Sequence, residues 1–377
     1  MSNEELTFEA QQGLDGFERL APAWSDLAKS MPAVRFNQFP EWYRAYLQSL
    51  EANPSGVWIV AAYRNNRLVG IFPLHFQDFR GGAFRPRLLG TIEHDQMQLS
   101  DFVFAQTPEN GTLFDAFTHW LRTQQILRWD GLRLRKISHD SSIGFAARAR
   151  LPKGTLALQY FASAYFLTDR TYDQATQAMT AKFNSNLRRR ARIAEQSAPL
   201  RHEVYRRAEE LPAAFEEFLQ LEASGWKGEA GTSSAIRCQP RMLGFYTALV
   251  REFGASESCV INLLWHGDTA VAGQFCLQID RTLYILKVGF SEAHSNFAPG
   301  ILLLERVLRR TCEDPGIHIL HLVNAPPWAR CFQPIVAGLW SYFAANWSVR
   351  GTLLHLGLLA KRRLTGGWNG APPLEEE

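Results

Sequence analysis

The sequence predicts an α/β protein that contains two copies of one structural unit. Each half of the chain has an apolar strand, a polar turn and a second apolar strand, at residues 57–76 and 259–279. This pattern is typical of a β-hairpin. A helical pattern rich in Trp and Tyr precedes each hairpin, at residues 39–50 and 215–253. The repeat indicates duplication, with the boundary between the copies inside residues 158–201.

The composition supports a folded protein with a substantial core. The chain has 377 residues, of which 46% are hydrophobic, 12% aromatic and 20% charged. This length is enough for two domains. The formal net charge is only +3, so we expect no DNA partner held by overall charge. The five cysteines form no CxxC pair, which argues against a disulfide framework and a zinc site, and we expect no metal.

The two ends of the chain bear on its location. The N-terminus is acidic and lacks the apolar core of a signal peptide, so a cytoplasmic location is expected. Near the C-terminus, the apolar run Val349–Ala360 contains Arg350 and His355 and is followed by Lys361-Arg362-Arg363. The run is too interrupted to span a bilayer. It predicts either a terminal core strand or a weak contact with a membrane surface.

A basic segment connects the two halves. Its Ala, Met and Leu residues recur at helical spacing over Tyr172–Gln196, which predicts one long helix. Two interpretations fit the run Leu187–Arg192. Its arginines either pair with Glu195 and neighbouring acids on a solvated face, or they bind phosphate or carboxylate groups, which would place Arg188 against a substrate.

The second half continues with a crossover pattern. Residues 283–290 form an apolar, β-branched and aromatic run that predicts a buried strand. A loop at 291–299, a helical pattern at 300–310 and a second apolar strand at 317–323 follow. Strand, loop, helix and strand in this order predict that the two strands are parallel neighbours.

The junction between this loop and helix carries Pro299-Gly300. A helix N-terminus that follows a strand and loop is a natural anion site, because free N–H groups and the helix dipole converge there. Proline suits the first helical turn, and glycine lets the backbone approach a ligand closely. Structural turns also carry this pair, so the junction alone does not define a ligand.

Several segments resemble known acyltransferases. Residues 288–304 resemble the central motif of the GNAT superfamily, although the usual loop Arg or Gln is missing and one loop glycine is kept. Residues 182–189, 221–228 and 284–290 resemble the BioF2-like or CelD-like acetyltransferases, which are similar to the FemAB family and carry tandem GNAT folds. This resemblance covers roughly residues 160–330, and Leu99–Phe102 resembles an element of the first domain.

The resemblance implies two tandem GNAT-like domains, at residues 1–165 and 166–377. Each would have a mixed, mostly antiparallel central sheet flanked by helices, and the second would carry the acyl-CoA site. The implied reaction transfers an acyl group from acetyl-CoA or another acyl-CoA to an amine. The acceptor would be a small molecule, a sugar or an envelope-polysaccharide precursor, which makes polysaccharide-synthesis proteins possible partners.

The resemblance also implies a set of site residues. For the cofactor these are Val288, Gly289, Phe290, Pro299, Gly300, Ile301, Leu302 and Asn324. Asp101 and Glu222 are candidate bases or orienting acids, and each also fits a structural carboxylate. Lys287 is the third catalytic candidate, a lone cation in an apolar strand that points either to solvent or into a cleft. Candidate substrate contacts are Trp226, Lys227, Arg188 and Tyr284.

Two other functions stay open at this point. A FemAB-like enzyme would take an aminoacyl group from charged tRNA, and binding to the basic segment would then depend steeply on salt. A non-catalytic component of a cellulose or exopolysaccharide synthesis system would keep the fold without the donor loop. No GxxxxGK[ST], GxGxxG, HExxH or GxSxG string is present, which argues against the commonest nucleotide-hydrolysis, dinucleotide, zinc-protease and serine-esterase sites.

Overall fold

The predicted hairpins are the framework of both halves in the computed structural model. The structure describes residues 6–77, 84–104, 108–149, 155–225, 227–228 and 231–364. Strands β2 (Val57–Arg64) and β3 (Arg67–Gln77) form the first hairpin, and β8 (Cys259–His266) and β9 (Thr269–Ile279) form the second. Both hairpins join a strand of 8 residues to one of 11. Both hairpin predictions are therefore confirmed.

The two hairpins share a register irregularity as well as their lengths. The pairing shifts between Ala62 and Tyr63 in the first hairpin and between Leu264 and Trp265 in the second. Both shifts lie two residues before the turn, so an extra residue is accommodated at the same place in each copy. The first turn uses Asn65 and Asn66 at positive φ, as a two-residue hairpin requires.

Contacts divide the chain into two units, each discontinuous in sequence. Unit 1 comprises residues 1–40, 52–162 and 337–377, and unit 2 comprises residues 41–51 and 163–336. The sequence predicts a single cut after residue 165. The difference arises because β12 (Ile335–Ala345) pairs with β5 of unit 1, which brings the C-terminal segment to that unit.

Helix α2 (Pro40–Ser49) explains why residues 41–51 belong to unit 2. Its Trp42 ring packs edge-on against Phe245 of unit 2, with the ring centroids 5.1 Å apart. Arg44 Nη1 lies 2.9 Å from Glu252 Oε2. An aromatic pair and a partly buried ion pair therefore hold a segment from the first half of the chain in unit 2.

The strand order is the same in both units when each is read from its outer edge. It is β1-β2-β3-β4-β5-β12 in unit 1 and β7-β8-β9-β10-β11-β6 in unit 2. In each unit the parallel neighbours are the two strands joined by a crossover helix, β4 with β5 and β10 with β11. The remaining bounds are β1 (Leu6–Gln12), β4 (Leu88–Gly90), β5 (Gly131–Ser138), β6 (Leu156–Leu167), β7 (Leu200–Tyr205), β10 (Thr282–Phe290) and β11 (Ile319–His321). The prediction of a mixed, mostly antiparallel sheet flanked by helices is confirmed, and its strands belong to one 12-stranded sheet.

Helices cover both faces of the sheet in unit 1. They are α1 (Gly13–Ser30), α3 (Pro108–Thr123), α4 (Ser142–Ala149) and α10 (Val349–Leu364). Leu89 and Tyr342 belong to the core that contains the α3 residues, whereas their chain neighbours Leu88 and Phe343 pack with Leu354 of α10. This alternation of side chains places α3 and α10 on opposite faces.

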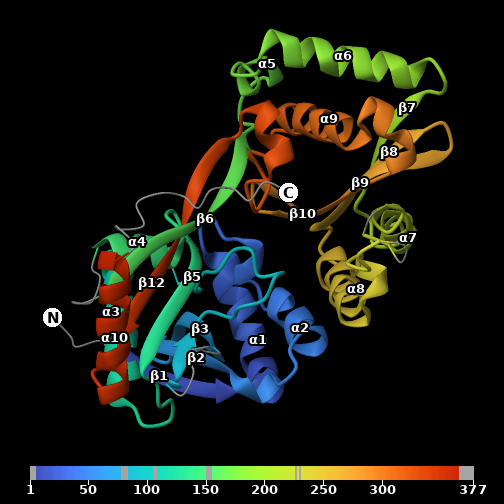
Figure 1. Ribbon diagram of the computed structural model, residues 1–377. Helices are drawn as coiled ribbons and strands as arrows, with labels where there is room; N and C mark the ends of the chain where they lie inside the picture. The colour runs from blue at the N-terminus through green and yellow to red at the C-terminus, as the bar shows by residue number, and fades with distance from the viewer. Residues whose placement is uncertain are drawn as a thin grey trace. The chain divides into compact units, whose positions relative to one another are not determined.

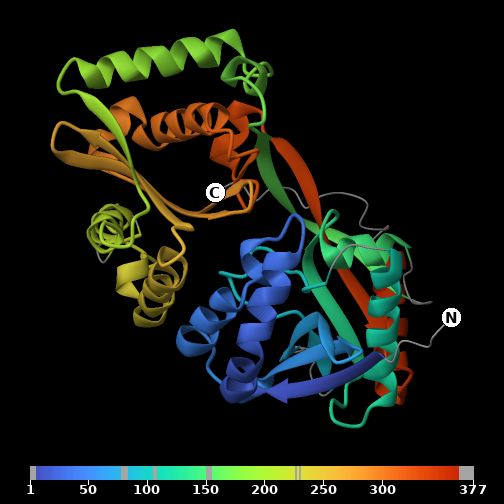
Figure 2. The same cartoon turned by 180° about the vertical axis from the view of Figure 1, so that it is seen from behind.

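Unit 2 has the same layered arrangement. Helices α7 (Leu211–Glu222) and α8 (Pro240–Gly254) lie on one face of strands β8–β10, and α9 (Pro299–Glu313) lies on the other (Figures 1 and 2). Helix α6 (Ala181–Glu195) packs outside α9. The crossover predicted from strand to loop to helix to parallel strand is confirmed.

Three predicted elements differ from the structure. The long helix over residues 172–196 is broken into α5 (Tyr172–Ala175) and α6, because the Thr180 hydroxyl accepts the Phe183 N–H at 3.2 Å and caps a new helix. The apolar run 349–360 forms helix α10 rather than a strand. Strand β11 covers only Ile319–His321 of the predicted 317–323.

Two glycines set the distance between α7 and the sheet. Gly273 of β9 and Gly289 of β10 are register partners. A Cβ at Gly289 would lie 2.9 Å from Glu222 Cα, and a Cβ at Gly273 would lie 2.9 Å from a ring carbon of Phe218. Only glycine at these two positions lets the C-terminal end of α7 approach so closely.

We expect Gly289→Ala to lower the free energy of unfolding by about 1–3 kcal/mol, because the helix backbone must move to admit the new carbon. Gly300→Ala is the matched control, since its Cβ would lie 3.7 Å from Phe290 Cβ, an ordinary contact. Urea unfolding of both variants measures the difference. Equal stability in the two variants would contradict the close approach of α7.

Candidate active site

The site begins where β10 and β11 separate. The two strands pair only from Thr282–Ile319 to Tyr284–His321. Beyond that point β10 continues to Phe290, paired with β9 on its other side. From Ile285 onward, the edge of β10 that faces away from β9 therefore has no strand partner in the described part of the chain and is open to a ligand.

A tight turn diverts the chain after β11. Val323 has a φ of 64°, which is unusual for a β-branched residue. Its N–H donates to His321 Nδ1 at 2.8 Å, and the Asn324 N–H donates to the Leu322 carbonyl at 2.7 Å. Val323 is buried, so packing and these two hydrogen bonds hold the strained turn in place.

A cavity of about 220 Å³ lies beside the open edge. Its walls come from the ends of β9 and β10, the first turn of α9, and Trp328 in the short helix Pro327–Phe332. The lining residues are Gly273, Gln274, Val288, Gly289, Phe290, Ala298, Gly300, Ile301, Leu303 and Trp328. Five of the eight predicted cofactor contacts therefore come together: Val288, Gly289, Phe290, Gly300 and Ile301.

The cavity wall is apolar apart from one buried amide. Gln274 is 2% exposed, and its Oε1 has no hydrogen-bond partner among the residues that the structure describes. A buried acceptor of this kind costs free energy unless a ligand or water donates to it. Gln274 therefore brings an unpaired acceptor next to the cavity.

The first turn of α9 offers few N–H donors to an anion. Pro299 has no N–H, and the N–H groups of Ile301 and Leu302 both donate to the Ala298 carbonyl, at 3.0 and 3.2 Å. Within this turn, Gly300 is the residue whose N–H is left to a ligand. The helix start can contribute to binding a phosphate, but with fewer donors than a glycine-rich loop.

A buried ion pair lies on the other side of β10. Glu222 Oε1 is 3.3 Å from Lys227 Nζ, and Glu222 Oε2 accepts the Ile236 N–H at 2.8 Å. Lys227 Nζ also donates to the Val288 carbonyl at 3.3 Å. Lys227 therefore contacts both the Glu222 carboxylate and the Val288 backbone, and all three residues were predicted to belong to the site.

Sequence and structure comparisons bear on this geometry. Residues 181–326 match the family model described as an acetyltransferase (GNAT) domain. The solved structure of FemX aligns with a TM-score of 0.54 at 10% identity, over 92% of this chain and 99% of that one. The C-terminal domain of a putative lysylphosphatidylglycerol synthetase from Agrobacterium fabrum aligns with a TM-score of 0.52 at 14% identity, over 94% and 100%. No curated protein sequence matches the chain.

The fold of the chain is similar to that of FemX, and residues 181–326 match a GNAT acetyltransferase domain. This matched segment of unit 2 contains the open strand edge, the cavity and the ion pair described above. The predicted resemblance is confirmed for the fold of the chain and for the GNAT domain of unit 2.

The remaining predicted contacts of unit 2 lie outside the cavity wall. Pro299 and Leu302 are buried in the first turn of α9, and Asn324 is exposed. Lys287 Nζ lies 6.0 Å from the ring centroid of Tyr246 in α8. The Tyr284 ring is buried, with its centroid 5.3 Å from that of His321.

The last predicted site residues lie on the basic helix α6 and in the chain segment after α7. Arg188 is exposed on α6. Glu195 pairs with Arg306 of α9, at 3.6 Å between Nη2 and Oε1, rather than with an arginine of its own helix. Trp226 lies outside the described residues.

Two residues of the cavity wall, Gln274 and Trp328, were not predicted from the sequence. Gln274 is a lone polar residue in the apolar run 270–277 of the second hairpin. Lys287 was predicted because it is also a lone polar residue in an apolar strand, so the same criterion could have identified Gln274. Trp328 follows two prolines in a segment with no strand or helix periodicity. Its place at the cavity depends on a chain reversal that local sequence does not encode.

Unit 1 holds the other candidate acid, Asp101, in a structural network. Its carboxylate accepts backbone N–H groups from Phe102, Ser142 and Ile143, at 2.9, 2.9 and 3.0 Å. Gln38 Nε2 donates to it at 3.1 Å. Burial raises the pKa of Asp101 to about 6, although the Arg35 guanidinium and the three N–H donors oppose the shift. The carboxylate joins the start of α4 to the preceding chain.

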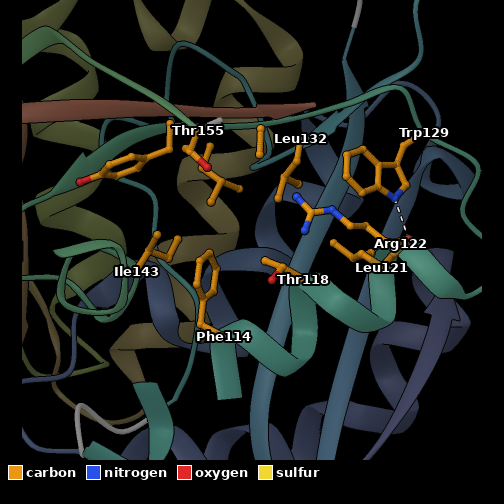
Figure 3. A pocket seen from close by; sticks show the side chains of 11 residues that line it. Phe114, Thr118, Leu121, Arg122, Trp129, Leu132, Ile143 and Thr155 are labelled. Atoms are coloured by element: carbon orange, nitrogen blue, oxygen red, sulfur yellow. Dashed lines mark hydrogen bonds between the residues drawn. The ribbon is translucent and has the colours of Figure 1, made fainter. Parts of the chain in front are cut away.

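A small apolar pocket also lies in unit 1, lined partly by α3 and β5 (Figure 3). Phe114, Leu121, Trp129 and Leu132 are among its lining residues, and the Trp129 indole N–H donates to the Leu121 carbonyl at 2.8 Å. Its volume is about 20 Å³, which is room for about one water molecule. It is too small for an acyl donor.

We expect Asp101→Asn to remove a pH-dependent component of stability. The folded chain binds the Asp101 proton more tightly than the unfolded chain, so this carboxyl lowers the free energy of unfolding as the pH rises from about 4 to about 6. A shift of two pKa units corresponds to about 3 kcal/mol. Urea unfolding across this range should show a smaller decline in the variant. Parallel pH dependences would contradict the buried, proton-binding Asp101.

Proposed function

We propose that unit 2 transfers an acyl group from an acyl thioester, most simply acetyl-CoA or another acyl-CoA, to an amine. The observation that supports this is the cavity between the open edge of β10 and the start of α9. A strand edge binds an extended chain with amide groups, and a helix start favours its phosphate end. CoA carries both features. A cytoplasmic location would supply this donor.

The cavity fits a slender arm rather than a whole nucleotide. Its volume of about 220 Å³ is below the ~300–1,000 Å³ of pockets that enclose a drug-sized ligand. The apolar walls suit the alkyl parts of a pantetheine arm and a short acyl chain. The buried Gln274 Oε1 would accept one of the arm's amide N–H groups.

The open edge of β10 also supplies a backbone N–H that could bind the oxygen of the reacting carbonyl. The contact from Lys227 Nζ shows that the Val288 carbonyl points to the open side of β10. In an antiparallel strand the N–H and C=O of one residue face the same neighbour, so the Val288 N–H points there too. We assign this N–H to stabilise the oxyanion that forms when the amine attacks the thioester.

We assign different roles to the two residues of the ion pair. Lys227 fixes the Val288 peptide, which makes it a positioning residue. Glu222 is our candidate for the amine proton, because each carboxylate oxygen keeps a lone pair after its present hydrogen bond. The amine nitrogen bonds to the acyl carbon, the carbon–sulfur bond breaks, and the leaving thiolate takes up a proton.

An aminoacyl-tRNA donor is the second candidate. It is favoured by the basic face of α6, where Arg188, Arg189 and Arg192 are exposed, and by the small number of N–H donors at the start of α9. RNA binding at this face should weaken steeply with salt. For either donor, the acceptor that we propose is the amine of a small molecule, a sugar or an envelope-polysaccharide precursor.

Thermal unfolding with free CoA, acetyl-CoA and longer acyl-CoAs tests the donor. A ligand that binds only the folded protein at one hundred times its Kd adds about 2.7 kcal/mol of stability. We therefore expect the melting temperature to rise by several degrees, to an extent that depends on acyl chain length. The same titration with aminoacyl-tRNA tests the second candidate. No shift with any donor would favour a non-catalytic role.

Gly300→Trp should abolish the shift with acyl-CoA, because the indole would project from the cavity wall into the donor site. Gly300→Ala is the control, since its added carbon makes only ordinary contacts and should keep most of the binding. Circular dichroism checks that both variants fold. Unchanged affinity in a folded Gly300→Trp protein would rule out this cavity as the donor site.

A double-mutant cycle separates the structural and chemical roles of the ion pair. Lys227→Met leaves the buried Glu222 without its cation and should cost about 2–4 kcal/mol of stability. Adding Glu222→Gln removes the buried charge and should restore part of that loss. We expect acyl transfer to stay at least about tenfold below the original protein in the double variant. Recovery of both stability and activity would limit the pair to a structural role.

A further inference from the structure

Helix α10 has a second apolar face that does not pack on unit 1. Its inner face contributes Leu354, 4% exposed, to the core together with the partly buried Leu358 and Leu359. On the opposite side, Val349 is 80% exposed, and Leu353 and Leu356 are each 54% exposed. These three residues follow one another at intervals of four and three, so they form one stripe along the helix.

An exposed tryptophan extends this stripe. Trp347 directly precedes α10 and is 60% exposed, with its ring centroid 5.9 Å from that of His355. We call Trp347, Val349, Leu353 and Leu356 the outer stripe. Large apolar side chains that stay in water are not needed for folding, so a contiguous set of them marks a surface for another molecule.

The charges of the same helix identify that molecule. Arg350 is exposed beside the outer stripe, and the last turn of α10 carries Lys361, Arg362 and Arg363. The sequence from Asn346 to Leu364 contains no Asp or Glu. A helix with an apolar stripe, a tryptophan and only positive charges is typical of helices that lie in the interface of an anionic bilayer.

A second copy of the chain fits this surface less well. Antiparallel pairing of two α10 helices about a two-fold axis would bring the basic last turn of one copy near Arg350 of the other. These like charges would repel each other, and residues 346–364 contain no Asp or Glu to compensate them. An anionic lipid surface instead provides an opposite charge for each basic residue.

We propose that the outer stripe of α10 docks unit 1 on an anionic membrane surface, where the apolar side chains enter the headgroup region and the basic residues contact lipid phosphates. None of the helices in the described part of the chain is long and apolar enough to cross a bilayer. The docking is therefore peripheral and reversible. It is independent of the transfer reaction proposed for unit 2.

Co-sedimentation with lipid vesicles tests the proposal. The full chain is mixed with vesicles of phosphatidylcholine plus phosphatidylglycerol, and separately with vesicles of phosphatidylcholine alone. We expect binding to the anionic vesicles only, and weaker binding as salt is added. A chain that stays in the supernatant with both vesicle types would overturn the proposal.

The double variant Leu353→Gln/Leu356→Gln tests the stripe itself. Gln keeps the helix propensity of Leu but removes two apolar contacts, so we expect vesicle binding to fall at least about tenfold. Ile126→Gln is the matched control, because Ile126 is 62% exposed in unit 1 outside α10, and it should bind as the original chain does. Melting temperatures verify that both variants fold. Binding by the double variant that equals that of the original chain would overturn the proposal.

Replacing Lys361, Arg362 and Arg363 with Gln should weaken binding to the phosphatidylglycerol vesicles by roughly fivefold per residue removed. Binding that this triple replacement leaves unchanged would overturn the proposal. Sedimentation equilibrium then tests the alternative occupant. A dimer of the original chain that becomes a monomer in Leu353→Gln/Leu356→Gln would show that the stripe binds a second copy, and would overturn the membrane assignment.

Discussion

The turn at Val323 is the constraint on which the candidate site depends. A parallel strand that continued past His321 would pair with β10 and close its edge. The chain instead reverses at a β-branched residue with a φ of 64°, a conformation that costs about 1–3 kcal/mol. The hydrogen bond from the Val323 N–H to His321 Nδ1 and the burial of Val323 offset that cost. The open edge of β10 follows from this turn, and the cavity and the start of α9 lie beside that edge.

Comparison of the two units shows which features they share and which they do not. Both units keep the same strand order, the same hairpin lengths and the same parallel pair. All three residues of β4, Leu88–Gly90, pair with β5, whereas β10 extends from Thr282 to Phe290 and pairs with β11 over its first three residues. Only β10 of these two strands therefore offers a long unpaired edge. The strand order is common to both units, and the open strand edge of the candidate site is a property of unit 2.

The parts of this structure that sequence could predict are those that local periodicity determines. Alternation and a polar turn identify both hairpins, and the order of strand, loop and helix identifies the crossover. The capping hydroxyl of Thr180 breaks a helix whose apolar spacing continues across the break, so spacing alone overestimates its length. The apolar run 349–360 fits a strand or a helix equally well, and packing against Leu88 and Phe343 decides for the helix.

The site was predictable only where one segment carries it. Val288 to Phe290 and the start of α9 are contiguous in sequence around one loop, and the resemblance to GNAT motifs marks them. Gln274 and Trp328 reach the cavity through tertiary contacts between segments that are far apart in the chain. For Asp101 the sequence left a catalytic and a structural role open, and the structure supplies a structural one, since its carboxylate accepts three backbone N–H groups, two of them at the start of α4.

The weak anion site at the start of α9 also affects how the missing loop arginine should be understood. Gly300 supplies the N–H group left unpaired in the first turn, so the phosphate end of the proposed acyl donor would contribute little to binding. Selection would then depend on the arm and the acyl end, which we propose meet the edge of β10, Gln274 and the cavity walls. Thioester and aminoacyl ester donors both present an activated carbonyl to such an edge. Loss of the loop arginine is therefore compatible with catalysis, since it weakens the contact that matters least to the reacting carbonyl.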